Sequence, residues 1–278
     1  MGPPRSGTTI LGALLAQHSS VAYFEEPRSV WRYGNESVSD LLKPSLAREE
    51  VKQHIRNYFV TNTHRAGKTR MLEKTPQNCL RPDFMDAVFP DAKYVAITRD
   101  PYATIASIAS FWRDHTHSLS GIGKKKILEK IKQTSLRQLF PYSKEFIKRA
   151  LPSLGNKPSV MWGPRLPGLE GMVKDLTLNE VAAYQWRYCT EYLSNFAQRN
   201  PNKIQMWSLE KLNEAHFREI LEFSELSEEV TVMKAFNKKF AYQKDLRTKE
   251  INETFVAEVY PIIAPTLALL KEHNRVSY

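Results

Sequence analysis

The stretch MGPPRSGTTILGALL opens the chain (residues 1–15). Its glycines Gly2 and Gly7 have the spacing of the phosphate-binding pattern G-x-x-x-x-G-K-[ST], and Thr9 stands at the Ser/Thr position. Thr8 stands where that pattern has lysine. A glycine-rich turn that runs into a helix directs backbone N–H groups and the positive end of the helix dipole at one spot. The stretch therefore predicts an anion site at the start of a helix.

Downstream of this stretch, short apolar strands alternate with helical segments. The clearest strand is YVAIT (Tyr94–Thr98), a β-branched apolar run. Such alternation favours a parallel sheet with helices on both faces. We therefore predict a three-layer, P-loop-like α/β fold with a central parallel sheet. Further predicted strands cover 21–24, 70–72 and 204–207, and predicted helices cover 8–17, 48–61, 81–89, 102–113, 178–199 and most of the chain after 211.

The 278 residues fit a single domain over 1–278. A segment at about 118–170 breaks the alternation of strands and helices. It contains the basic run Lys124–Lys126 and the Pro/Gly-rich stretch WGPRLPGLEG (Trp162–Gly171). We interpret it as an insertion, either a lid over the site or an ordinary surface excursion.

Composition restricts the classes of partner and compartment. The net charge of +10 favours an anionic partner, although a solvated basic surface has the same composition. Two distant cysteines, Cys79 and Cys189, form neither a disulfide framework nor a CxxC metal motif. Apolar stretches of about ten residues are too short to span a bilayer, and the first residues lack a signal-peptide pattern. We expect a cytoplasmic protein that binds no metal and no membrane.

Four segments carry a resemblance to a known family. RSGTT (Arg5–Thr9) resembles the 5′-phosphosulfate loop of sulfotransferases that use 3′-phosphoadenosine 5′-phosphosulfate (PAPS). EEPR (Glu25–Arg28) and EKTP (Glu73–Pro76) resemble segments of tyrosylprotein sulfotransferases and related bacterial enzymes. YVAITRDPYATIASIASF (Tyr94–Phe111) is similar to the family's strand, loop and helix that bind the 3′-phosphate. After residue 118 the likeness is loose.

The resemblance implies a catalytic set. Glu26 would be the general base, with Glu25 as the second choice. Arg5 and Lys74 would stabilise charge on the transferring group and the leaving phosphate. Alternatively, Glu26 is a structural partner of Arg28, Arg5 is a surface arginine and Lys74 is a solvated turn lysine.

The resemblance also implies a donor-binding set. The 5′-phosphosulfate would bind to the loop and the helix start, and the 3′-phosphate to Arg99 and Ser107. The alternative for the threonines is helix capping, and for Ser107 it is simple packing. The expected donor-binding residues are Arg5, Ser6, Gly7, Thr8, Thr9, Arg99 and Ser107.

The chain departs from the family pattern at its first residue. Family members have an apolar strand directly before the phosphate loop, whereas Met1 here directly precedes Gly2. We expect the natural protein to have further residues upstream.

Several other side chains invite a functional role but favour a plain one. His64, in the loop-like stretch TNTHRAG, is more simply a surface histidine than a base. His18 at a helix end is more simply structural. Lys238 and Lys239 are more simply part of a solvated basic face than 3′-phosphate ligands. The aromatic residues Trp162, Trp186 and Tyr184 would line a pocket or belong to the core.

We therefore predict transfer of a sulfuryl group from PAPS to a hydroxyl or amine, without a metal. The predicted acceptor is a small molecule, as in bacterial secondary metabolism, although a tyrosine peptide or a sugar fits the resemblance too. A P-loop kinase or NTPase is the first alternative, but Thr8 replaces its lysine. A non-enzymatic polyanion binder that uses residues 124–132 is the second. No RNA-binding motif is present, so we expect no nucleic-acid partner.

Overall fold

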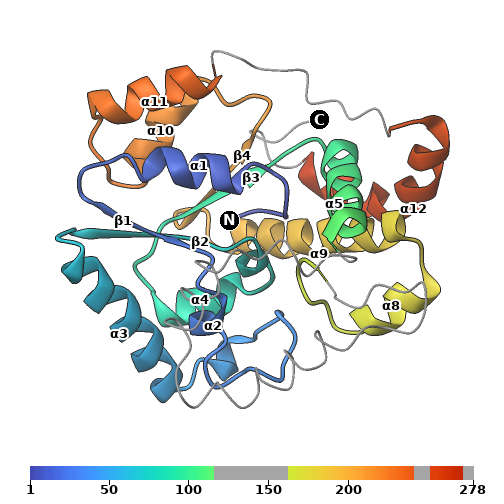
Figure 1. Cartoon of the computed structure of the whole chain (residues 1–278), viewed down its shortest axis with the longest axis horizontal. Coiled ribbons are helices and arrows are strands. Elements are labelled where there is room, and N and C mark those ends of the chain that lie inside the picture. Colours follow the sequence, from blue (N-terminus) through green and yellow to red (C-terminus); the bar gives the residue numbers. More distant parts are fainter. Residues whose placement is uncertain (116–161, 241–250, 272–278) are drawn as a thin grey trace.

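The computed structural model describes residues 1–115, 162–240 and 251–271. Strands and helices alternate along the first half of the chain, which confirms the predicted α/β class (Figure 1). The strands are β1 (Val21–Glu25), β2 (Arg70–Lys74), β3 (Tyr94–Thr98) and β4 (Ile204–Ser208). The longer helices are α1 (Thr8–Leu15), α3 (Glu49–Arg65), α5 (Pro101–His115), α9 (Leu178–Arg199), α10 (Glu214–Phe223), α11 (Val230–Phe240) and α12 (Glu253–Leu270). The shorter ones are α2 (Arg28–Trp31), η1 (Pro44–Leu46), η2 (Pro76–Leu80), α4 (Pro82–Val88) and α8 (Leu169–Asp175).

The described strands form two parallel pairs rather than one continuous hydrogen-bonded sheet. β1 pairs with β2, and β3 pairs with β4. Met1 lies between the pairs, since its amino group donates to Val95 O at 2.5 Å and its carbonyl accepts from Ile97 N at 2.9 Å. The carboxylate of Glu73 on β2 also interacts with that amino group. The predicted parallel arrangement is therefore present, with Met1 beside the edge of β3 that faces β2.

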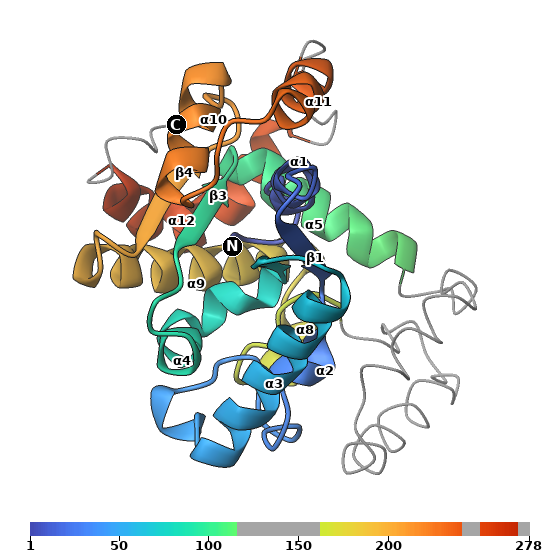
Figure 2. The same cartoon turned by 90° about the vertical axis from the view of Figure 1, so that its left-hand side faces the viewer.

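The two faces of the β3–β4 pair carry separate apolar cores. Ala96 and Met206 belong to a core with α3, α4, α5, α9 and α12, whereas Ile97 and Trp207 belong to a core with α1, α10 and α11. This division follows from the alternation of side chains along a strand. Figure 2 shows α10 and α11 on one side of the strands and α3 and α4 on the other. The result is the expected three-layer architecture.

The helix after residue 48 is longer than the sequence pattern predicts. α3 continues to Arg65, so His64 lies in the last helical turn and not in a loop, as we expected from TNTHRAG. Phe59 and Thr63 are buried, so this face of the helix packs against the core close to its C-terminal end and stabilises the additional turn. Gly67, with φ of 65°, follows the helix in the left-handed conformation that glycine adopts easily.

α12 differs from the expectation about apolar stretches. Among the described residues it is the one helix that is long and apolar enough to cross a membrane, judged by length and composition alone. It packs along α9 through polar contacts as well as apolar ones. Asn179 Nδ2 donates to Glu258 at 2.8 Å, and Thr266 Oγ1 donates to Glu191 at 2.7 Å. Glu253 and Glu258 lie within this helix, so its uninterrupted apolar part is shorter than the helix as a whole.

Most of the predicted insertion at 118–170 lies outside the described residues. Its last part is described and packs against the body of the protein. Trp162 O accepts from Gln185 Nε2 on α9 at 2.9 Å. Arg165 N donates to Asp40 Oδ2 at 2.8 Å, and Asp40 N donates back to Arg165 O at 2.9 Å. Residues 162–166 are thus tied to α9 and to the loop after α2.

Candidate active site

The glycine-rich loop at residues 2–7 is fixed to β3. The buried Ser6 hydroxyl lies 2.7 Å from Pro3 O and 2.9 Å from Ile97 O. Arg5 and Gly7 have φ of 68° and 96°, so the loop makes two left-handed steps before α1 begins. The Ser6 side chain is therefore engaged in shaping the loop, and its role in donor binding remains a prediction.

The start of α1 has the properties of an anion site. No side chain caps this end, and its first turn contains no acidic residue. The N–H groups and the dipole at such an end favour a negative charge. Thr8 is buried, whereas Thr9 is exposed and directs its hydroxyl toward β2. The N-cap position is occupied by Gly7, and not by Thr8 or Thr9.

Lys74 connects this loop to the two glutamates. It stands at the end of β2, where the register pairs it with Glu25 of β1. Its ammonium is 4% exposed and donates to Thr9 Oγ1 at 3.0 Å, Glu25 Oε1 at 3.2 Å and Glu26 Oε1 at 2.9 Å. Lys74 is therefore a buried cation between the helix start and a pair of carboxylates, and not a solvated turn lysine.

Glu26 occupies a strained position between two cations. Its φ of 54° is unusual for a residue that is not glycine. Its amide donates to Lys74 O at 2.8 Å, and its second carboxylate oxygen accepts from Arg28. Burial raises the pKa of Glu26, but Arg28 and Lys74 together outweigh burial and lower that pKa below 4.5. Glu26 is therefore a carboxylate near neutral pH, with cations on both of its oxygens.

Two arginines and a serine meet on the other side of the loop. Arg99 directly follows β3 and is 9% exposed, and Arg5 Nε donates to Ser107 Oγ of α5 at 3.0 Å. Burial lowers the pKa of Arg99, Glu210 and Asp100 raise it, and the charge of Arg5 lowers it further. A guanidinium whose charged form is disfavoured by a neighbouring guanidinium favours an anion beside it. The two residues expected at the 3′-phosphate, Arg99 and Ser107, therefore lie near each other. Arg5, which was expected at the transferring group, bonds to Ser107 in this structure.

Two acidic residues fix the backbone around Arg99. Asp100 Oδ1 accepts from Ala103 N at 2.7 Å and so caps α5. Glu210 accepts from Asp100 N and from Ser208 Oγ, both at 2.9 Å. Glu210 was not among the predicted site residues, although its position two residues after β4, beside the end of β3, was a usable signal.

An aromatic pair lies next to Arg5, and of its two members Trp162 was named as a possible pocket residue whereas Phe111 was missed. The Arg5 guanidinium lies 5.3 Å from the centre of the Phe111 ring, and that ring lies 4.4 Å from the ring of Trp162. Phe111 follows Ser107 by four residues, so both side chains share one face of α5. That spacing was the signal in the sequence. Trp186, in contrast, is fully buried and belongs to the core.

The remaining candidates lie outside this cluster. His64 is exposed on α3, and Lys238 and Lys239 are exposed in the last turn of α11. His18 is buried, with Nε2 at 3.1 Å from Ser227 Oγ and 3.5 Å from Glu229, in agreement with the expected structural role. The basic run at 124–132 lies outside the described residues.

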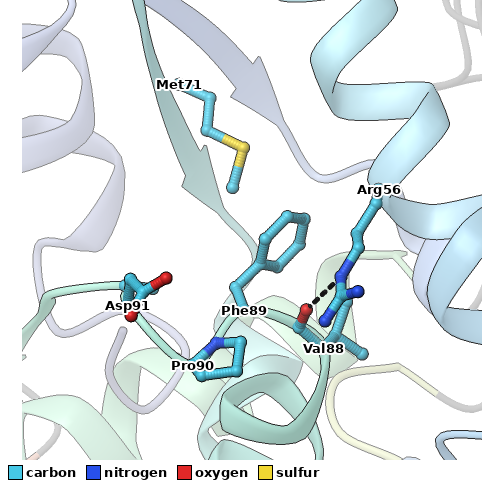
Figure 3. A pocket seen from close by; sticks show the side chains of 7 residues that line it. Arg56, Met71, Val88, Phe89, Pro90 and Asp91 are labelled. Atoms are coloured by element: carbon cyan, nitrogen blue, oxygen red, sulfur yellow. Dashed lines mark hydrogen bonds between the residues drawn. The ribbon is translucent and has the colours of Figure 1, made fainter.

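A pocket of about 480 Å³ lies at the opposite end of the strands (Figure 3). Met71 near the start of β2 and Phe89 before β3 line it, together with Arg56, which donates to Val88 O at 2.7 Å. Arg99 follows the carboxyl end of β3, and Ser6 of the phosphate loop bonds to Ile97 near that end, where ligands bind in open α/β sheets. This pocket is therefore separate from the candidate active site.

The site has cations at two ends and a carboxylate pair at one of them. Lys74 stands near the helix start, and Arg5 and Arg99 stand near α5. This arrangement suits a ligand with two separated anionic groups, and Glu26 is placed to accept a proton beside one of them. Within the described ranges no group of three or more His, Cys, Asp or Glu side chains has the arrangement of a metal site.

Comparisons with known proteins point to one family. Residues 1–148 match the model of the sulfotransferase family. The chain is 28% identical over 132 residues to the nodulation protein NoeE of Sinorhizobium fredii, a match covering 40% of this chain and 30% of NoeE. It is 29% identical over 120 residues to protein-tyrosine sulfotransferase A of Caenorhabditis elegans, covering 39% and 32%. The matches thus span about a third of the length of these relatives.

A solved structure shares the fold along the whole chain. The sulfotransferase domain from the curacin biosynthetic pathway superimposes with a TM-score of 0.54 and 14% identity, covering 100% of this chain and 96% of that one. The family match covers more than half of this chain, including the loop, Glu26, Lys74, Arg99 and Ser107. Together with the fold, it identifies the chain as a member of the sulfotransferase family.

Proposed function

We propose that the protein transfers the sulfuryl group of PAPS to a hydroxyl or amine of an acceptor. The observation that carries the proposal is the contact set of Lys74 with Thr9, Glu25 and Glu26 at the start of α1. It places a cation and a base beside a helix end that favours an anion. Arg99 and Ser107 would form a second anion site for the 3′-phosphate of the donor. Arg5, which was first expected at the transferring group, would join that site through its bond to Ser107.

The reaction would proceed in line, as in phosphoryl transfer. The acceptor oxygen or nitrogen forms a bond to sulfur, while the bond from sulfur to the bridging oxygen of the 5′-phosphate breaks. That bridging oxygen keeps the electron pair, and Lys74 and the helix start stabilise its charge. Glu26 takes the proton of the acceptor. The products are the sulfated acceptor, adenosine 3′,5′-bisphosphate and a proton.

For the acceptor we propose a small molecule. This choice is supported by the resemblance of the fold to the sulfotransferase domain from the curacin biosynthetic pathway. A protein acceptor is the second candidate, because one relative is a protein-tyrosine sulfotransferase. Parallel turnover of PAPS with phenols, sugars and tyrosine peptides would separate the two, and faster sulfation of a peptide than of any small molecule would overturn the first.

Donor binding can be tested before any acceptor is known. Adenosine 3′,5′-bisphosphate at about 100 times its dissociation constant should stabilise the folded state by roughly 2.7 kcal/mol. For a chain of this size that corresponds to a rise in melting temperature of roughly 5–10 °C. Arg99→Ala should lose most of this rise, and ATP with magnesium should produce little. A larger rise with ATP and magnesium than with the bisphosphate would refute the proposed donor.

A further inference from the structure

The Lys74 ammonium has no free donor in the described structure. A lysine ammonium carries three N–H donors and no acceptor. All three are directed at oxygens within 3.2 Å: Thr9 Oγ1, Glu25 Oε1 and Glu26 Oε1. With the side chain 4% exposed, water has almost no access to it. An incoming phosphosulfate oxygen can therefore bind Lys74 only if one of these three partners gives way.

The three partners of Lys74 differ in what else holds them. Glu25 is 53% exposed, so water solvates its carboxylate. Glu26 is 30% exposed and has a second cation, because Arg28 donates to its other oxygen. Thr9 sits at the helix start, where the phosphosulfate itself is expected. Neither carboxylate would be left as a buried, unpaired charge without Lys74, because Glu25 keeps water and Glu26 keeps Arg28. Glu26 is the one of the two that retains a cationic partner.

From these contacts we infer that Lys74 is a cation shared between Glu26 and the sulfuryl donor, so that Glu26 becomes the general base only after the donor has bound. This inference rests on the function proposed above. Glu25 is then a positioning residue, since it retains Lys74 while the bond to Glu26 is exchanged for one to the phosphosulfate. Donor binding therefore makes Glu26 available to take the proton of the acceptor.

The electrostatics support this order of events. In the free protein Arg28 and Lys74 hold the pKa of Glu26 below 4.5, which makes it a weak base. An anion on Lys74 removes one of these cations and adds a negative charge nearby, and both changes make Glu26 more basic. The groups that face Glu26 are Arg28 from α2, Lys74 from β2, and Tyr23 and Glu25 from β1. Among them, Lys74 is the one that also reaches the start of α1.

Proton uptake on ligand binding measures this coupling directly. We would titrate adenosine 3′,5′-bisphosphate by calorimetry at about pH 5, in two buffers with different ionisation enthalpies. Wild type should take up more protons than Glu26→Gln, by a substantial fraction of one proton. Glu25→Gln, which alters the other carboxylate on the same ammonium, should keep the wild-type uptake. Lys74→Met should lose it, because nothing then links the ligand to Glu26.

Each outcome separates the inference from the proposed function. If wild type does not bind the bisphosphate, the proposed donor is wrong. If it binds with the same proton uptake as Glu26→Gln, the donor site stands and the shared cation is refuted. If Glu25→Gln and not Glu26→Gln loses the uptake, Lys74 releases Glu25 and the inference is also overturned. If a variant melts far below wild type, the pH dependence of the wild-type enzyme serves instead. We would measure kcat/KM for the acceptor at saturating donor, and kcat/KM for the donor. The acid limb should lie at higher pH for the acceptor than for the donor.

Discussion

The conformation of the phosphate loop makes a sharp prediction for Gly7→Ala. Gly7 has φ of 96°, and a Cβ built there would lie 2.9 Å from Leu209 Cδ2. The left-handed conformation costs alanine about 1–2 kcal/mol. Crowding against Leu209, which is 6% exposed, adds roughly 1–3 kcal/mol. We therefore expect Gly7→Ala to lower the free energy of unfolding by about 2–5 kcal/mol.

Gly67→Ala is the matched control for this variant. Gly67 also has a left-handed φ, of 65°, but a Cβ there would meet nothing within 4 Å. It should therefore cost only the conformational part, about 1–2 kcal/mol. Urea unfolding followed by circular dichroism measures both variants. Equal costs for Gly7→Ala and Gly67→Ala would refute the contact with Leu209.

A double variant identifies the source of the cost. If Leu209 is the obstacle, Leu209→Ala should absorb part of the penalty of Gly7→Ala. The double variant should then be less destabilised than the sum of the two single variants by about 1–3 kcal/mol. Additive costs would show that the backbone conformation, and not the side-chain contact, makes glycine necessary at this position.

Three further variants or probes test the site and the core. Lys74→Met should reduce kcat by roughly 10²–10³-fold, as loss of a donor to a developing charge does, with the fold checked by circular dichroism. Folding lowers the pKa of Glu26, so its ionisation contributes stability above pH 4.5 that is lost as the pH falls. The difference in unfolding free energy between wild type and Glu26→Gln, measured in urea, should therefore shrink below that pH. Cys79 and Cys189 are fully buried, and the pKa of Cys189 is raised by its burial and by its contact with Cys79. A thiol reagent should therefore modify both cysteines only when the protein unfolds. Rapid reaction of the native protein would contradict this burial.

Elements with a strong local pattern were predicted to the residue. The strand Tyr94–Thr98 is a continuous β-branched run, and its bounds are as expected. The helix Leu178–Arg199 also has the expected bounds, because Thr177 and Glu180 form a capping box that fixes its start. Shorter elements such as α2 and η2 were missed, since four or five residues carry too little periodicity to be recognised.

The candidate site was predicted in composition but not in its contacts. The order of motifs indicated Glu26, Lys74 and Arg99, and the fold brings each to the carboxyl ends of the strands. The hydrogen bond from Lys74 to Thr9 depends on the β1–β2 register and on the packing of α1 against β2, and both are tertiary features. The left-handed conformation of Glu26, which precedes a proline, was likewise invisible in a residue pattern. The functional roles of these residues remain predictions.

The two ends of the site differ in how an anion would meet them. At the α5 end, the charge of Arg5 lowers the pKa of Arg99, so a 3′-phosphate would relieve a repulsion that exists in the free protein. At the α1 end, a phosphosulfate must compete with Glu25 and Glu26 for a lysine whose donors are all used. Net affinity should therefore come mainly from the 3′ end, because the gain at the 5′ end is offset by the bond that Lys74 gives up. Binding energy from a remote group is then available to release Glu26 where sulfur is transferred, which is the division expected when an enzyme uses binding to lower a barrier.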